Sequence, residues 1–126
     1  MKLKLGGDVA ALNPDVADAR LPGRSKYGAQ PAERNGEKFD SQAEARRYDE
    51  LCLLQKAGDI TRLVTHPVYS LRVNSIEICR YEADFEYLRG GQRVVEDVKG
   101  VRTDAYKIKA RLMLACHGIA IVEVEA

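Results

Sequence analysis

The stretch between residues 63 and 99 limits the possible folds most, because it is rich in residues that favour β-strands and is interrupted only by short turn signals. These turn signals are Asn74-Ser75 and Gly90-Gly91. The β-rich runs between and around them cover 63–73, 76–88 and 93–99. Consecutive strands joined by such short turns pair antiparallel, so the stretch predicts a three-stranded meander.

Helix signals lie on both sides of the meander. The S-x-x-E spacing of Ser41 and Glu44 is a capping box, which predicts a helix that begins at Ser41 and ends at Gly58. A second helix is expected from a Thr103 cap to Gly118. Its apolar residues recur at helical spacing and are expected to be buried: Ala105, Ile108, Leu112 and Ala115.

The second helix leads into an apolar strand at 119–124, and a strand, helix and strand of this length imply a right-handed parallel crossover. The resulting order α-β-β-β-α-β predicts an α/β fold, with a mixed sheet flanked by helices, in a domain at 38–126. Residues 1–37 mix Gly, Pro, Ala and charges without a period. They are expected to form a flexible or partner-contacting arm, with a short hairpin turning at Asn35-Gly36.

Composition excludes several classes of protein. Three cysteines without a CxxC pair, and only two histidines, argue against a disulfide framework or a structural zinc site. The chain has no secretory signal and no apolar run long enough to span a bilayer, so a cytoplasmic protein without a membrane partner is expected.

The net charge of +1 argues against binding nucleic acid by bulk charge alone, so any contact with DNA requires a local basic patch. The segment 99–111 is such a patch, with Asp104 as its single acid. The alternative interpretation of this segment is an ordinary solvated helix face.

The turn at Gly90-Gly91 carries the main chemical prediction, because its register places Asp84 directly across from Asp97 and Glu82 opposite Lys99. Directly opposed side chains have Cβ atoms about 4.5–5.5 Å apart. Two carboxylates at that spacing can hold a hard cation such as Mg²⁺. Lys99 can then orient a water or stabilise charge on a phosphate. These are the parts that phosphodiester hydrolysis requires.

Two alternatives stay open from the spacing alone. The hairpin can be an ordinary solvent-facing one, in which Asp84 and Asp97 merely sit near Lys99. A register slip of one residue would bring Glu96 into the place of Asp97.

Four sequence blocks follow one another on the predicted elements: Phe39-Asp40-Ser41-x-Ala43-Glu44-Ala45-x-x-Tyr48, Tyr81-x-Ala83-Asp84-Phe85, Val95-Glu96-Asp97-Val98-Lys99-Gly100 and Tyr106-x-x-Lys109. In this order they resemble a family of small phage-encoded proteins of the PD-(D/E)XK nuclease superfamily, related to RecU-type Holliday junction resolvases. The resemblance extends from about Ser25 to Val124. Ala83 stands where the superfamily name has a proline.

The resemblance implies a restriction-endonuclease-like core in which Asp84 and Asp97, helped by the Val98 carbonyl, bind Mg²⁺ or Mn²⁺ while Lys99 assists the attacking water. Glu44 would be an additional catalytic acid on the first helix, although the capping box also accounts for it. Contacts with the DNA backbone are expected from the basic segment, at Arg102, Tyr106, Lys107, Lys109 and Arg111.

The expected function is therefore a metal-dependent endonuclease that cuts Holliday junctions or other branched DNA in phage recombination, replication or packaging. A homodimer is expected by analogy with the relatives. The alternatives are a nicking nuclease without junction preference, and a non-catalytic module of the same fold that binds DNA or protein. The presence of Asp84, Asp97 and Lys99 together argues against the last of these.

Overall fold

The computed structural model describes residues 30–126, which fall into two compact units divided after Gln42. In the first unit, β2 (Ala32–Arg34) pairs antiparallel with β3 (Glu37–Phe39). Asn35-Gly36 forms the turn with positive φ at both residues, as a tight hairpin turn requires. The predicted short hairpin is confirmed, while the rest of the predicted arm lies outside the described residues.

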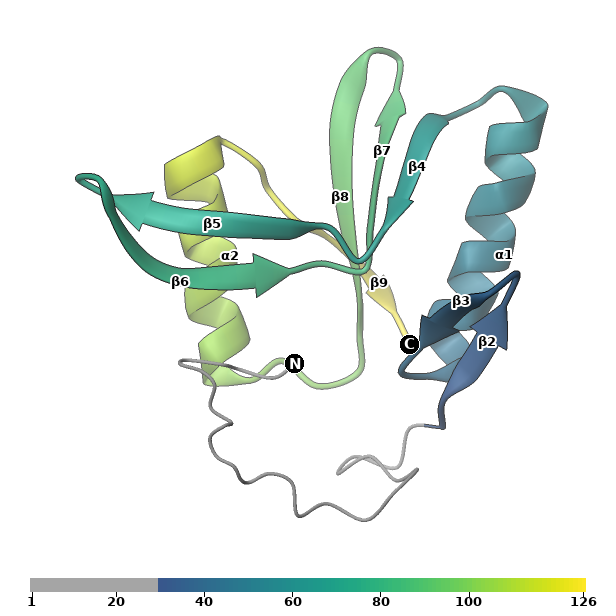
Figure 1. The fold of residues 1–126 in the computed structure, drawn as a ribbon, viewed down its shortest axis with the longest axis horizontal. Helices are drawn as coiled ribbons and strands as arrows, with labels where there is room; N and C mark the ends of the chain where they lie inside the picture. The colour runs from purple at the N-terminus through teal and green to yellow at the C-terminus, as the bar shows by residue number, and fades with distance from the viewer. Residues whose placement is uncertain (1–29) are drawn as a thin grey trace. The chain divides into compact units, whose positions relative to one another are not determined.

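The second unit holds the predicted order of helix, strands, helix and strand, which confirms the α/β class (Figure 1). Both helices begin and end at the predicted signals, since one starts directly after Ser41 and the other is capped by Thr103 and Gly118. The elements are α1 (Gln42–Ala57), β4 (Thr61–Thr65), β5 (Val68–Val73), β6 (Ile76–Glu82), β7 (Phe85–Arg89), β8 (Gln92–Lys99), α2 (Asp104–His117) and β9 (Val122–Glu125).

The predicted meander is present but bent. Each of its first two runs is divided in the middle, one at His66-Pro67 and the other at Ala83-Asp84. Backbone hydrogen bonds cross the bend, from His66 N–H to the Asp84 carbonyl (2.9 Å) and from Ala83 N–H to the Pro67 carbonyl (3.0 Å). His66 has a φ of +54°, and Pro67 has no N–H to donate. Beyond the bend, β5 and β6 form a separate two-stranded sheet, which turns away from β7 and β8 (Figure 1).

The main sheet has the strand order β4-β7-β8-β9. Arg89 pairs with Gln92 across Gly90-Gly91, which confirms the predicted register of the β7–β8 hairpin. β9 pairs parallel with β8, which confirms the crossover through α2. β8 therefore lies between two neighbours in a mixed sheet, and its residues from Val95 to Val98 are all buried.

The two faces of β8 pack against different helices. On one face, Tyr48 of α1 stacks on Phe85 of β7, with ring centroids 6.3 Å apart. On the other, α2 packs along the β5–β6 hairpin, as Figure 1 shows. The buried residues of this second cluster come from β5, β6, the bend, β8 and α2, and are Tyr69, Leu71, Tyr81, Ala83, Val95, Tyr106 and Met113.

The prediction of which face of α2 is buried is wrong. Tyr106 and Met113 are buried, whereas Ala105, Ile108 and Ala115 are exposed and Leu112 is only half-buried. Tyr106, Ala110 and Met113 also recur at helical spacing, so the helix carries two apolar stripes. The larger Tyr and Met side chains fill the space over β5 and β6. Within the described residues, neither helix is long and apolar enough to cross a membrane.

Candidate active site

Asp84 and Asp97 come together where β7 begins and β8 approaches its end. The Asp84 N–H donates to the Glu96 carbonyl (3.1 Å), which continues the ladder of the hairpin by one residue. The Asp84 carboxyl accepts from the Val98 N–H at 2.7 Å and is hydrogen-bonded to the Asp97 carboxyl. The predicted juxtaposition of the two acids is therefore present in the fold.

The Asp84 carboxyl favours its protonated form. Burial, the charge of Asp97 and the charge of Glu44 raise its pKa to about 9, and only the Val98 N–H acts in the opposite direction. Asp97 is itself 5% exposed. At neutral pH the Asp84 carboxyl is thus expected to hold a proton beside the buried side chain of Asp97.

Asp97 is held in place from a second direction by Tyr81. The Tyr81 hydroxyl donates a short hydrogen bond to Asp97 Oδ2, and burial followed by the Asp97 charge raises the Tyr81 pKa, so the phenol remains a neutral donor. In a straight strand Tyr81 would face away from Asp97. The bend at Ala83-Asp84 turns it inward.

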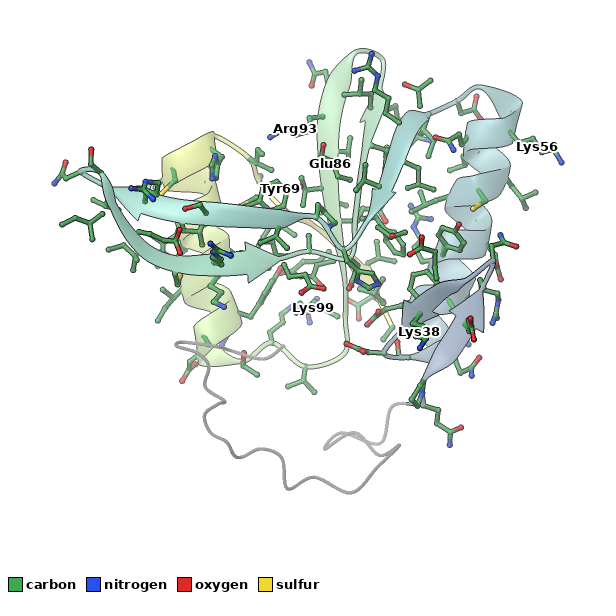
Figure 2. All side chains as sticks on the ribbon, in the orientation of Figure 1. Lys38, Lys56, Tyr69, Glu86, Arg93 and Lys99 are labelled. Atoms are coloured by element: carbon green, nitrogen blue, oxygen red, sulfur yellow. The ribbon has the colours of Figure 1, made fainter. Side chains whose placement is uncertain are left out.

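Lys99 completes the group from the end of β8 (Figure 2). Its Nζ lies 3.5 Å from Asp97 Oδ1 and 3.9 Å from the centroid of the Tyr106 ring, a cation–π arrangement. Tyr106 is fixed in turn, because its N–H donates to Thr103 Oγ1 (3.1 Å) and its hydroxyl donates to Glu123 (2.8 Å). The ammonium group is thereby held beside the acid pair.

Glu44 approaches the same acids from α1. It lies in the first turn of the helix, where the capping box predicts it, and it is half-buried. Its charge acts on Asp84 strongly enough to help raise that residue's pKa. Its place in the first turn of α1 and its effect on Asp84 are therefore compatible.

The acid pair fits a hard divalent cation. Once the Asp84 carboxyl loses its proton, two buried carboxylates lie together and can bind Mg²⁺ or Mn²⁺, which prefer oxygen ligands. Among residues 30–126, no three His, Cys, Asp or Glu side chains form a ready-made metal cluster. The cation would therefore take ligands from Asp84, Asp97, water and a backbone carbonyl. Val98 can supply that carbonyl, because the N–H and C=O of one strand residue point to the same edge and its N–H points at Asp84.

The structure places Glu82 elsewhere than predicted. The bend ends the hairpin at Asp84, so Glu82 pairs with Val68 of β5 instead of lying opposite Lys99. Its carboxylate lies 3.4 Å from His66 Nδ1, and its side chain is 55% exposed.

The predicted DNA-binding residues separate into two groups. Arg102 is engaged by Glu123 (2.7 Å) and Glu125 (3.2 Å) of β9, and Tyr106 is buried beneath Lys99. Both side chains are thus occupied by contacts within the protein. Lys107 and Arg111 are exposed, whereas Lys109 is half-buried on the side of α2 that faces Cys79.

Sequence reasoning missed Tyr81 and the buried ion pair of Arg47 with Glu96. Tyr81 belongs to a quoted block, but its inward position depends on the bend. Arg47 lies three residues after Glu44 on one face of α1, but no local signal relates it to Glu96.

Comparison with curated proteins and with solved structures gave no match. Residues 24–118 match one family model, and they include Glu44, Asp84, Asp97 and Lys99. The chain therefore belongs to the family described as "Protein of unknown function (DUF1064)".

Proposed function

We propose that this protein is a metal-dependent endonuclease of the PD-(D/E)XK type that hydrolyses phosphodiester bonds in DNA. The observation that carries the proposal is the buried, hydrogen-bonded pair of Asp84 and Asp97, with the Lys99 ammonium 3.5 Å from Asp97 Oδ1. Buried acids that repel each other lower the stability of a fold, and a function at this position explains their presence.

Each residue of the site has a role in this reaction. Asp84, Asp97 and the Val98 carbonyl hold Mg²⁺ or Mn²⁺, which supplies Lewis-acid polarisation of the phosphate and a lower pKa for a bound water. Tyr81 fixes Asp97 Oδ2, which leaves Oδ1 on the side of Lys99. Lys99 donates to the attacking water or to a phosphate oxygen as negative charge develops there. Hydrolysis forms one bond from water oxygen to phosphorus and breaks one from phosphorus to sugar oxygen.

The substrate class rests on the resemblance described above. Branched DNA, such as a Holliday junction, is the proposed substrate, and a homodimer is the proposed cutting unit because two strands must be cleaved. Lys107 and Arg111 support DNA binding, since they are exposed, lie one helical turn apart and follow the site on α2.

The test is cleavage of labelled four-way junction, flap and linear duplex DNA with Mg²⁺ or Mn²⁺. Asp97→Asn and Lys99→Ala are each expected to lower the rate by roughly 10²-fold or more, the scale for removing a group that stabilises transition-state charge. Asp59→Asn, which changes an exposed acid in the loop after α1, is the matched control and should cut normally.

Preferential cutting of the junction that both site variants abolish would support the enzyme and its substrate class. Equal cutting of all three substrates would support a nuclease without junction preference. DNA binding without any cleavage would contradict the proposal in favour of a binding module.

A further inference from the structure

A buried ion pair joins α1 to the strand that carries the acids. Arg47 donates to both oxygens of Glu96, from Nε at 2.9 Å and from Nη2 at 2.7 Å. Glu96 is 1% exposed and also accepts a short hydrogen bond from the Tyr87 hydroxyl. The second Arg47 amino group donates to Glu50 on the next turn of the helix (2.8 Å). The guanidinium is therefore fixed on both the strand side and the helix side.

This ion pair connects the residues of the candidate site through short chain segments. Glu96 precedes Asp97, and its backbone carbonyl accepts from the Asp84 N–H. Arg47 follows Glu44 by three residues on the same face of α1. Glu96 thus contacts the helix of Glu44 through its side chain, contacts Asp84 through its backbone, and directly precedes Asp97.

Stability alone does not explain such a pair. Removing two charges from water costs about as much as their attraction returns, and apolar residues of similar size often stabilise a fold equally well. The stacked Tyr48 and Phe85 rings already provide apolar contact between α1 and the sheet. A bidentate Arg–carboxylate pair contributes a fixed direction, because its two parallel hydrogen bonds tolerate little rotation or sliding.

We propose that the Arg47–Glu96 ion pair is a positioning device that fixes the Glu96–Asp97 segment of β8 against α1, and thereby holds the Asp84 and Asp97 carboxyl groups in the arrangement that binds the divalent cation. This inference rests on the proposed function. Arg47 and Glu96 act through Asp97 and Asp84 and touch neither cation nor substrate. Groups that orient metal ligands in this way typically change metal affinity or activity by about 10–100-fold when they are removed.

The experiment measures Mn²⁺ binding to the full chain by electron paramagnetic resonance of free Mn²⁺, together with thermal unfolding in EDTA and kcat and KM for DNA cleavage. The main variant is Arg47→Met with Glu96→Leu, which replaces the ion pair by apolar side chains. Arg47→Lys, which keeps the charge and loses the bidentate geometry, is the second variant. Arg80→Gln with Glu77→Gln removes an exposed ion pair of β6 and is the control.

The double variant is expected to unfold within a few degrees of wild type, to bind Mn²⁺ about 10–100-fold more weakly and to lose kcat with little change in KM. Arg47→Lys should fold normally and weaken Mn²⁺ binding in the same direction. The control should match wild type in every measurement.

Unchanged Mn²⁺ affinity in Arg47→Lys and in the double variant, with weaker binding in Asp97→Asn, would overturn this inference and leave the proposed function standing. A wild-type chain that binds no Mn²⁺ would overturn the inference and the metal-dependent function together.

Discussion

At the scale of a single residue, the Asp84 carboxyl belongs to the candidate site and also affects the stability of the fold. Its pKa is raised to about 9 in the folded protein, while an aspartic acid in the unfolded chain has a pKa of about 3.9. Between these two values the folded state binds a proton that the unfolded state has released. The contribution of Asp84 to the free energy of unfolding is therefore greatest below about pH 4 and is lost progressively as the pH rises toward 9.

We predict that Asp84→Asn stabilises the metal-free protein at alkaline pH. The neutral amide can still accept from the Val98 N–H and donate to Asp97, and it carries no charge to repel. In EDTA, the Tm of the variant should exceed that of wild type at pH 8.5 and approach it at pH 5, with roughly 4–8 °C for each 1 kcal/mol gained.

Added Mg²⁺ should stabilise wild type at pH 8.5 and leave Asp84→Asn unchanged, because the proposed cation site requires both carboxylates. Asp59→Asn serves as the exposed control. Parallel pH dependence of wild type and Asp84→Asn would mean that Asp84 is already ionised at neutral pH.

At the scale of the elements, the bend in the meander forms the site. It turns Tyr81 toward Asp97 and detaches β5 and β6 as the support for α2. The bend depends on the left-handed backbone of His66, a conformation that β-branched residues adopt only at a cost of about 1–2 kcal/mol.

We predict that His66→Val lowers the free energy of unfolding by about 1–2 kcal/mol relative to His66→Asn, since asparagine tolerates positive φ and valine does not. Both substitutions remove the imidazole near Glu82, so the comparison isolates the backbone effect. Urea unfolding of the two variants provides the measurement. Equal stabilities of the two variants would contradict the predicted backbone effect at this position.

The bend also separates the features that the sequence could predict from those that it could not. The turns, caps and β7–β8 register follow from local signals near Asn74, Gly90 and Thr103, and they place Asp84 beside Asp97. The position of Glu82 depended on two straight strands. Only tertiary packing specifies that His66 takes positive φ, because His66-Pro67 is equally compatible with an extended chain.

Contacts between side chains that are far apart in the sequence could not be predicted from local signals either. Arg47 and Glu96 lie 49 residues apart in the chain, and no periodicity relates them. Tyr106 was identified as a functional residue, but its place beneath Lys99 requires knowing which stripe of α2 is buried.

For the whole molecule, the net charge of +1 means that DNA affinity must come from a few exposed groups. Arg102 is neutralised by β9, and Lys99 is turned toward Asp97, so the basic patch is smaller than the sequence suggested. Lys107 and Arg111 are its exposed remainder.

We predict that Lys107→Ala and Arg111→Ala each weaken duplex and junction binding alike. Each should also reduce the slope of log affinity against log salt by about 0.9 for every DNA phosphate that is no longer neutralised. Fluorescence anisotropy in EDTA, where no cleavage occurs, measures both quantities. Lys56→Ala on α1 is the matched control. An unchanged salt slope would place the DNA on another surface.

The two-sided burial of β8 has a consequence for mutagenesis. Glu96 faces α1 and Asp97 faces the opposite cluster, and each of these neighbouring acids keeps its own partners because the hairpin keeps its register. An insertion of one residue at Gly90-Gly91 that shifts this register would place Glu96 where Asp97 lies. An insertion at this distant turn should therefore disturb the acid pair as strongly as a substitution of Asp84 or Asp97.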